Sequence, residues 1–380
     1  MPDENDPRTF PEPAAAPAES ARLHALAAAS QAAMGKEATA LDGQIQAALA
    51  MMLSSGMGDR LAAVFATAPS VAVYRHLWRI LAHCERDRAA GDALGVTVFA
   101  LPLVIVAGIE GERHSQVTLS GVLEDAAALA AILREHGALA GNQSFGLANT
   151  LVAAGAIDIA QLPDVLAWRA LPEAATLRRA LEPARLVLAG GPETVQLRFL
   201  PGSAIAAPGV DLLRGLDVGK WGIPLTRELG RQLAAPGISI LALPRAPQSL
   251  LHAVRLGRAA HREVGAHVFA SNAIRKLRAS VGEPTAVIST HRCADAPGGG
   301  EVRLSLSSPF DPRQAEGFRC PLFPLDHVGE VVAMLSELLA ECRVGDVRLV
   351  AGVHDDRDPS TGQPLLFKGD SLPASSLAMH

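Results

Sequence analysis

Hydrophobic positions recur with a helical period over the first quarter of the chain. Residues 20–55 are alanine-rich and predict one or two helices, with a break near Gly35. Ser70 then stands where it can cap a longer helix, and five apolar residues share one face of that helix: Val73, Leu77, Ile80, Leu81 and Cys84. The pattern therefore predicts a helical region at 20–92.

Strand-like patterns begin at Gly95. The segment "GVTVFALPLVIV" predicts a buried strand and "SQVTLSG" a short alternating one. A helical stretch is expected to follow as far as Glu182. The segment "ARLVLAGGPETVQLRFL" at 184–200 then predicts two strands joined by a Gly-Gly-Pro turn. We take residues 93–236 as a first α/β unit.

The last third shows a cleaner alternation of strands and helices. Two helices in a row, "PQSLLHAVRLGRAAHREVG" and "SNAIRKLRASVG", are counted as one crossover between strands. The resulting order is βαββαβ, which is typical of the split-βαβ or ferredoxin-like arrangement. The strands of this second α/β unit, 237–370, are expected at 237–244, 284–291, 301–308 and 346–353.

The predicted fold class is α+β, a helical region followed by two α/β units. The segment "GVTVFALP" at 95–102 resembles "GISILALP" at 237–244, which raises an internal duplication of the two units as a hypothesis. Residues 1–19 are acidic and proline-rich and are expected to form a disordered leader. Residues 371–380 are expected to form a disordered tail.

Composition and charge narrow the function classes. A net charge of −5 gives no general electrostatic reason to bind nucleic acid or an acidic membrane. The longest uncharged run, 93–109, falls short of the roughly 18 residues of a membrane helix and contains Pro102. The four cysteines lie far apart without a CxxC pair, which favours reduced thiols. We therefore expect a soluble, cytoplasmic protein.

The segment "THRCADAPGGGEVRLSLSSPF", 290–310, raises the question of a phosphate-binding loop. Such a loop needs a strand, then glycines, then a helix, so that backbone N–H groups converge on the anion. Here alternating strand patterns stand on both sides of Gly298, Gly299 and Gly300. The prediction is a hairpin turn.

Metal-ligand residue types occur in the same region. His291 and Cys293 are spaced two apart, and Cys320 or His327 could approach them in the folded chain. Zinc sites use four ligands, commonly with paired short spacings, so this HxC pattern is a weak signal. Asp356 and Asp358 have the alternate spacing of a calcium loop, but the required glycine is displaced and Phe367 occupies the twelfth position, which favours a turn.

Two further motifs fail in their context. The segment "GLDVGK", 215–220, has a glycine spacing one residue too short for a phosphate-binding P-loop. The segment "NQSFG", 142–146, resembles a nucleophile elbow but lacks the preceding strand. Helix capping by Ser144 is the simpler interpretation.

Residues 251–280 carry six basic side chains and one acidic one, Glu263. A solvated helix face is one interpretation, and a site for an anion or an acidic partner is the other. The chain has no RNP1-like sequence, and the candidate strands "ISILAL" and "RLSLS" contain no aromatic residue, which argues against RNA recognition by stacking on a sheet. His261 is expected to pack against the protein. The basic residues are Arg255, Arg258, Arg262, Arg275, Lys276 and Arg278.

The sequence therefore favours a non-catalytic cytoplasmic binding or assembly protein, with a protein partner, a small ligand or self-association and with no cofactor. One alternative is an enzyme or metal-binding protein. A second alternative is nucleic-acid or anion binding through the basic helices. The enzyme or metal site would use residues of the C-terminal unit: His291, Cys293, Cys320, Asp355, Asp356 and Asp358.

Overall fold

Helices and strands are both abundant in the chain, and antiparallel strand pairs occur in each of the three sheets formed by the described residues, which confirms the α+β class. None of the described helices has both the length and the apolar content needed to cross a membrane. The computed structural model describes the following residues: 15–90, 95–107, 116–119, 121–138, 144–153, 157, 159–163, 184–187, 194–206, 218–233, 238–242, 248–280, 282–293, 299–308, 315–357, 365–367 and 377–379.

The chain forms two compact units. The first consists of Met1–Thr97, Gly155–Ala170 and Ile205–Val210. The second consists of the remaining three segments: Val98–Ala154, Leu171–Ala204 and Asp211–His380.

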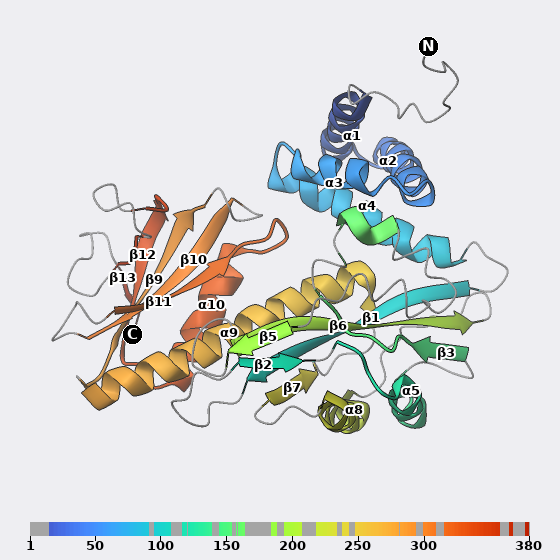
Figure 1. The fold of residues 1–380 in the computed structure, drawn as a ribbon. Coiled ribbons are helices and arrows are strands. Elements are labelled where there is room, and N and C mark those ends of the chain that lie inside the picture. The colour runs from blue at the N-terminus through green and yellow to red at the C-terminus, as the bar shows by residue number, and fades with distance from the viewer. Residues whose placement is uncertain are drawn as a thin grey trace, which may run out of the picture. The chain divides into compact units, whose positions relative to one another are not determined.

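The described part of Met1–Thr97 in the first unit forms four α-helices, as the hydrophobic pattern predicts for a helical region (Figure 1). Gly35 separates the first two helices and adopts a φ of +58°, a conformation that glycine reaches without steric cost. The Ser70 hydroxyl accepts a hydrogen bond from the backbone N–H of Val73 at 3.2 Å, which confirms the predicted cap. The helices are α1 (Ala15–Ala32), α2 (Lys36–Ser54), α3 (Gly58–Ala66) and α4 (Val71–Ala90).

Helix α1 begins five residues earlier than expected. The leader was predicted to extend to residue 19, but 15–19 are helical, while 1–14 lie outside the described residues. Alanine has the highest helix propensity, and a proline is tolerated in the first turn because the N–H groups there have no partner within the helix. Pro17 therefore does not prevent the helix from starting at Ala15.

The second unit contains a six-stranded sheet in the order β3-β6-β1-β7, with β4 paired to β6 and β8 paired to β1. Its longest strand, β1, is apolar on both faces and buried from Val98 to Ile105, which explains its unbroken hydrophobic run. The strands are β1 (Gly95–Ala107), β3 (Ser144–Leu147), β4 (Val152–Ala153), β6 (Val195–Ala206), β7 (Ile238–Ala242) and β8 (Gln248–Ser249). Two helices, α5 (Ala126–Glu135) and α8 (Val218–Leu233), contact each other.

Two predictions for this region are wrong. The stretch expected to be helical as far as Glu182 contains the strands β3 and β4, and Ser144 lies in β3 instead of capping a helix. The hairpin expected at 184–200 does not form within the described residues, because β5 (Ala184–Val187) pairs with β2 (Gln116–Leu119). Local patterns identify an apolar segment, but they do not identify the distant strand with which it pairs.

The C-terminal sheet has the strand order β11-β10-β9-β12-β13. Its apolar face packs against α9 (Leu250–Ser280) and α10 (Val328–Glu341), as Figure 1 shows for α10. Ile288, Leu304 and Leu335 are among the fully buried residues of this core. The strands are β9 (Thr285–Arg292), β10 (Gly300–Ser307), β11 (Ala315–Pro321), β12 (Asp346–His354) and β13 (Leu377–Met379).

The ferredoxin-like order requires the strand at 237–244 to belong to this C-terminal sheet. In the structure that strand, β7, pairs antiparallel with β1, so the predicted βαββαβ order needs correction. The two segments that resemble each other in sequence are thus neighbours in one sheet. The C-terminal sheet gains β11 in place of β7.

Helix α9 is a single helix of 31 residues where two helices were predicted. The expected break falls near Gly265, but this glycine is buried against the ring of Phe318 on β11. A Cβ atom at this position would lie 3.4 Å from the ring, an ordinary van der Waals distance, so the contact does not require a glycine. A single glycine lowers helix propensity by only about 1 kcal/mol and need not end a helix. The predicted disordered tail, 371–380, also needs correction, because 377–379 form β13.

Candidate functional site

The triple glycine lies in a hairpin, as predicted. Strands β9 and β10 are antiparallel neighbours from Thr285–Ser307 to Arg292–Gly300. The hairpin is closed by a hydrogen bond from the N–H of Cys293 to the carbonyl of Gly299 at 3.1 Å, and Gly299 has a φ of +71°. Gly298 lies outside the described residues. No helix follows the glycines, so the geometry of a phosphate-binding loop is not formed.

The second face of the C-terminal sheet is polar and nevertheless buried. Alternate residues of β9 and β10 point to this face, opposite to the apolar core. Their side chains are at most 4 % exposed, with the single apolar member Val287 fully buried. The polar members are Thr285, Ser289, His291, Glu301, Arg303, Ser305 and Ser307.

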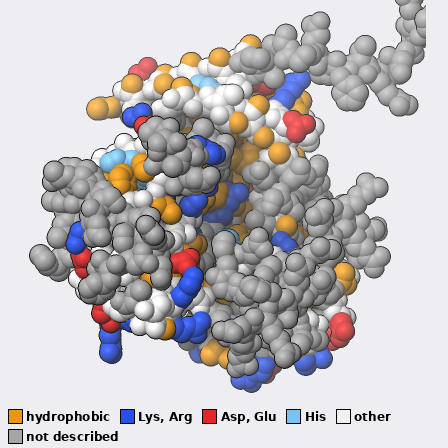
Figure 2. Space-filling view, turned by 60° about the vertical axis from the view of Figure 1, so that its left-hand side comes forward, with side chains coloured by type: hydrophobic (Ala, Val, Ile, Leu, Met, Phe, Trp, Pro, Cys, Tyr) orange, Lys and Arg blue, Asp and Glu red, His pale blue; other side chains and the backbone are white. Residues whose placement is uncertain are grey.

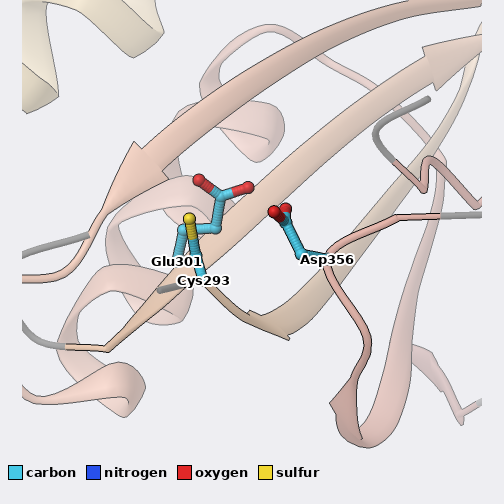
Figure 3. A group of neighbouring side chains, drawn as sticks. All are labelled: Cys293, Glu301 and Asp356. Atoms are coloured by element: carbon cyan, nitrogen blue, oxygen red, sulfur yellow. The ribbon is translucent and has the colours of Figure 1, made fainter. Parts of the chain in front are cut away.

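A cluster of charges lies at the end of this face where the hairpin turns. Glu301 and Arg303 come from β10, Arg319 from β11, and Asp356 follows β12. Figure 3 shows the thiol of Cys293 and the carboxylates of Glu301 and Asp356 directed toward a common point. Their ligand-type atoms all lie within 4.8 Å of one another. We call these five residues the charge cluster.

Arg303 is the centre of the charge cluster. Its fully buried guanidinium donates to the carboxylates of both Glu301 and Asp356. One of its terminal nitrogens, Nη1, also donates to the carbonyl oxygens of Asp356 and Leu365, each at 2.7 Å. A planar guanidinium can bond several acceptors at fixed angles, which lysine cannot do. Arg303 thus links β10 to the backbone at Asp356 and to the backbone at Leu365.

The two carbonyls held by Arg303 also lie close to each other. The N–H of Leu365 donates to the carbonyl of Asp356 at 3.0 Å, so the backbone at Leu365 lies directly beside the backbone at Asp356. Leu366 then lies against Gly317, where a side chain would collide with it. The segments 355–357 and 365–367 therefore cover part of the polar face.

Arg319 lies on the more exposed side of the charge cluster. Its Nε donates to both oxygens of Glu301 at 2.9 Å, and its Nη2 lies 3.5 Å from the sulfur of Cys293. The hydrogen bond to Glu301 raises the pKa of the Arg319 guanidinium. Glu301 is thus bonded by two guanidinium groups, and two cations stabilise its buried carboxylate.

The same arginines bear on the metal hypothesis. Cys293, Glu301 and Asp356 offer ligand types that suit a divalent ion, but their carboxylate oxygens already accept hydrogen bonds from Arg303 and Arg319. A metal ion would have to displace a fully buried guanidinium that also holds two backbone carbonyls. The arrangement is that of an internal salt-bridge network, in which the cations are supplied by the protein.

His291 is buried next to the charge cluster. Its Nδ1 donates to the carbonyl of Asp355 at 2.9 Å, because a carbonyl can only accept. In the neutral ring Nε2 then accepts from the hydroxyl of Ser289 at 2.8 Å. Burial lowers the pKa of His291, and the nearby Arg303 and His354 lower it further. Both ring nitrogens are therefore used within the protein.

The depressed pKa of His291 predicts that the protein loses stability in acid. Above the ordinary value of 6.5 the ring is neutral in both the folded and the unfolded chain. As the pH falls below this value the unfolded chain takes up the proton first, so unfolding is favoured until the folded ring is also protonated. We expect the denaturant midpoint to fall between about pH 7.5 and about pH 5.5.

The matched variant is His291→Gln, which removes the titrating group and keeps a polar side chain. Its midpoint should change less over the same interval of pH, because only the carboxylates and the other histidines still titrate. An equal change in the variant and the original chain would show that His291 does not cause the loss.

The cysteines of the C-terminal unit do not gather at one place. Cys293 belongs to the charge cluster, whereas Cys320 is fully buried on the opposite, apolar face. Burial raises the pKa of Cys320 to about 12. Burial, together with the charge of Glu341, also raises the pKa of the half-buried Cys342. A thiol with a raised pKa is a poor nucleophile near neutral pH.

We therefore expect slow and ordered alkylation of the native thiols. Iodoacetamide at about pH 8 should label Cys342 before Cys320, because only Cys342 is reachable by solvent without unfolding. Cys320 should react after denaturant is added. Mass spectrometry of the peptides measures both rates, and rapid labelling of Cys320 in the native protein would contradict its burial.

Three further residues belong to the metal or enzyme hypothesis: Asp355, His327 and Asp358. Asp355 contributes its backbone carbonyl to His291. His327 is the residue that precedes α10. Asp358 lies outside the described residues.

The basic helix is largely balanced by its neighbours. Arg262 forms an ion pair with Asp326 at 2.5 Å, Lys276 pairs with Glu316, and Arg278 pairs with Glu283 at 2.9 Å. The guanidinium of Arg258 lies over the ring of Phe323 at 4.5 Å, and Arg275 donates to Asn272. Arg255 is exposed. Figure 2 shows basic side chains of one face interspersed with acidic and hydrophobic ones.

His261 packs as expected. Its Nε2 lies 3.0 Å from the carbonyl oxygen of Val195.

The residues of the charge cluster that the sequence did not reveal are Glu301, Arg303 and Arg319. The available signal was the alternation of "EVRLSLS", which places Glu301 and Arg303 on one face of a strand.

No protein-family model, no curated protein and no solved structure matches the chain. The arrangement of its own residues is therefore what supports a function.

Proposed function

We propose that the chain is a non-catalytic binding or assembly protein that acts through protein contacts in the cytoplasm. The observation that carries this proposal is the charge cluster. Glu301, Arg303 and Asp356 bond one another, and the neighbouring ring of His291 bonds Ser289 and Asp355. A catalytic group must be able to reach a substrate, whereas each of these groups already bonds an internal partner, and Glu301, Arg303 and His291 are buried.

Exposed apolar side chains support the binding part of the proposal. Ile223 in α8 is 65 % exposed and Val353 in β12 is 57 % exposed. In the first unit, Met34 is 89 % exposed. Burying such side chains against a partner is favourable by about 25 cal/mol for each Å² of apolar surface.

The alternative functions have less support from the geometry. A metal site or an enzyme would need Cys293, Glu301 and Asp356, whose carboxylates the arginines occupy. Nucleic-acid or anion binding would need the basic face of α9, where three of the six basic side chains form ion pairs.

Two measurements on the purified chain test the proposal. Size-exclusion chromatography with light scattering, over a range of concentrations, should detect self-association, and cross-linking in the native cell extract should detect another partner. Elemental analysis should find no stoichiometric metal, and a chelator should leave the thermal midpoint unchanged. A chain that stays monomeric, cross-links to nothing and holds one metal ion would contradict the proposal in favour of the metal-protein alternative.

A further inference from the structure

Strand β12 pairs along most of one edge and along only a short part of the other. On the inner side it runs parallel to β9, with pairs from Asp346–Thr285 to His354–His291. On the outer side it pairs only with β13, from Val347–Met379 to Leu349–Leu377. No described strand pairs with 350–354 on the outer side. An open edge presents backbone N–H and C=O groups to which another strand can bond.

The strand that occupies this edge is short. β13 has three residues, and they follow the described segment 365–367 after nine residues of chain (Figure 1). Three residues form few inter-strand hydrogen bonds, and ordering their backbone opposes the gain. Short elements of this kind open locally at low cost without unfolding of the core. Opening of β13 leaves the edge of β12 free.

The same edge cannot accept a long strand. The register of β12 shifts between Leu349 and Val353, and Gly352 within the shift has a φ of +88°. Bulges interrupt the regular spacing of hydrogen-bonding groups and end strand pairing. The regular part of the edge therefore matches a strand about as long as β13.

We propose that the outer edge of β12 is an exchangeable strand-binding site, filled here by the chain's own segment Leu377–Met379 and able to take the same segment of a second copy. The register places Leu377 and Met379 opposite the apolar positions Leu349 and Val347. A second copy supplies an identical segment, so exchange recreates the same residue pairs between two chains. This inference rests on the assembly function proposed above and names its partner.

A peptide-binding experiment tests the site directly. The probe is a labelled peptide with the sequence of residues 373–380, "PASSLAMH". The protein is compared as the full chain and as a variant that ends at Ala374. Fluorescence anisotropy should show that the shortened variant binds about tenfold more tightly, because the full chain's own segment competes.

A peptide that carries Ala378→Pro is the matched control. Ala378 pairs with Arg348 at the centre of β13, and proline removes an N–H and disturbs strand pairing. Its affinity for the shortened variant should fall about tenfold. Equal affinity for both peptides, or no binding to a shortened variant with an unchanged thermal midpoint, would overturn the proposal.

The full chain with Ala378→Pro covers the case in which the shortened variant does not fold. Hydrogen exchange at Val347–Leu349 should then increase about tenfold while β9 stays protected. The full chain should form a dimer as its concentration rises, and the proline variant should not. Self-association that survives Ala378→Pro would support the proposed function and overturn strand exchange, whereas unchanged hydrogen exchange would refute the open edge itself.

Discussion

Replacing Arg303 by methionine is expected to lower the free energy of unfolding of the C-terminal sheet by about 3–5 kcal/mol. Arg303 is fully buried and neutralises the carboxylates of Glu301 and Asp356. Methionine leaves Asp356 without its nearest cation and leaves two backbone carbonyls without this donor. The loss can be measured from hydrogen exchange of the β10 amides in increasing denaturant, which follows this sheet separately from the helical unit.

Arg319→Met is the control for this prediction. Arg319 bonds the same carboxylate of Glu301, but 47 % of its side chain is exposed to solvent. Water can replace the lost hydrogen bonds, so we expect a loss of about 1 kcal/mol or less. Equal losses in the two variants would show that burial of Arg303 does not determine the stability of the sheet.

Replacing Gly58 by alanine should destabilise the helical unit by about 1–3 kcal/mol. Gly58 begins α3 and lies against the short 3₁₀ helix η2 (Ile159–Gln161). A Cβ atom at this position would lie 1.8 Å from the carbonyl oxygen of Ala160. The atom in the way belongs to the backbone, so α3 and η2 would have to separate. Thermal unfolding followed by the helical circular dichroism signal measures the effect.

Gly43→Ala in α2 provides the opposite case in the same unit. Nothing lies within 4 Å of a Cβ built at Gly43, which is exposed inside a helix. Alanine has the higher helix propensity, so this variant should gain about 0.5–1 kcal/mol. A loss of stability in both variants would indicate that contact with Ala160 is not the cause at Gly58.

The sequence predicts well those elements that depend on neighbouring residues. The period of 3.6 in Val73, Leu77, Ile80 and Leu81 identifies α4, because a helix satisfies its backbone within one segment. The hairpin of β9 and β10 is also predictable, since two alternating strands stand on either side of the glycine-rich turn.

Elements that depend on distant contacts were missed. Nothing in the segment at 238–242 indicates that it pairs with β1, more than a hundred residues away, instead of joining the C-terminal sheet. Helix α9 continues through Gly265, which packs against Phe318 of a later strand. Such long-range contacts depend on the whole fold, so the periodicity of a local segment cannot predict them.

The candidate site was predicted in part for the same reason. His291, Cys293 and Asp356 were singled out by residue type, and the structure brings them to one end of the sheet. Glu301 and Arg303 were overlooked because alternating polar residues in a strand normally face solvent. Their burial depends on 355–357 and 365–367, which return across the polar face.

The guanidinium of Arg303 donates hydrogen bonds to the carbonyls of both Asp356 and Leu365, and this has a consequence for protein engineering. The two ends of the intervening segment are fixed to the sheet, whatever sequence connects them. The entropy of closing a loop rises slowly with length, by about 0.6 kcal/mol for each doubling. Foreign peptides grafted between these two anchor points should therefore be displayed without loss of the scaffold beneath them.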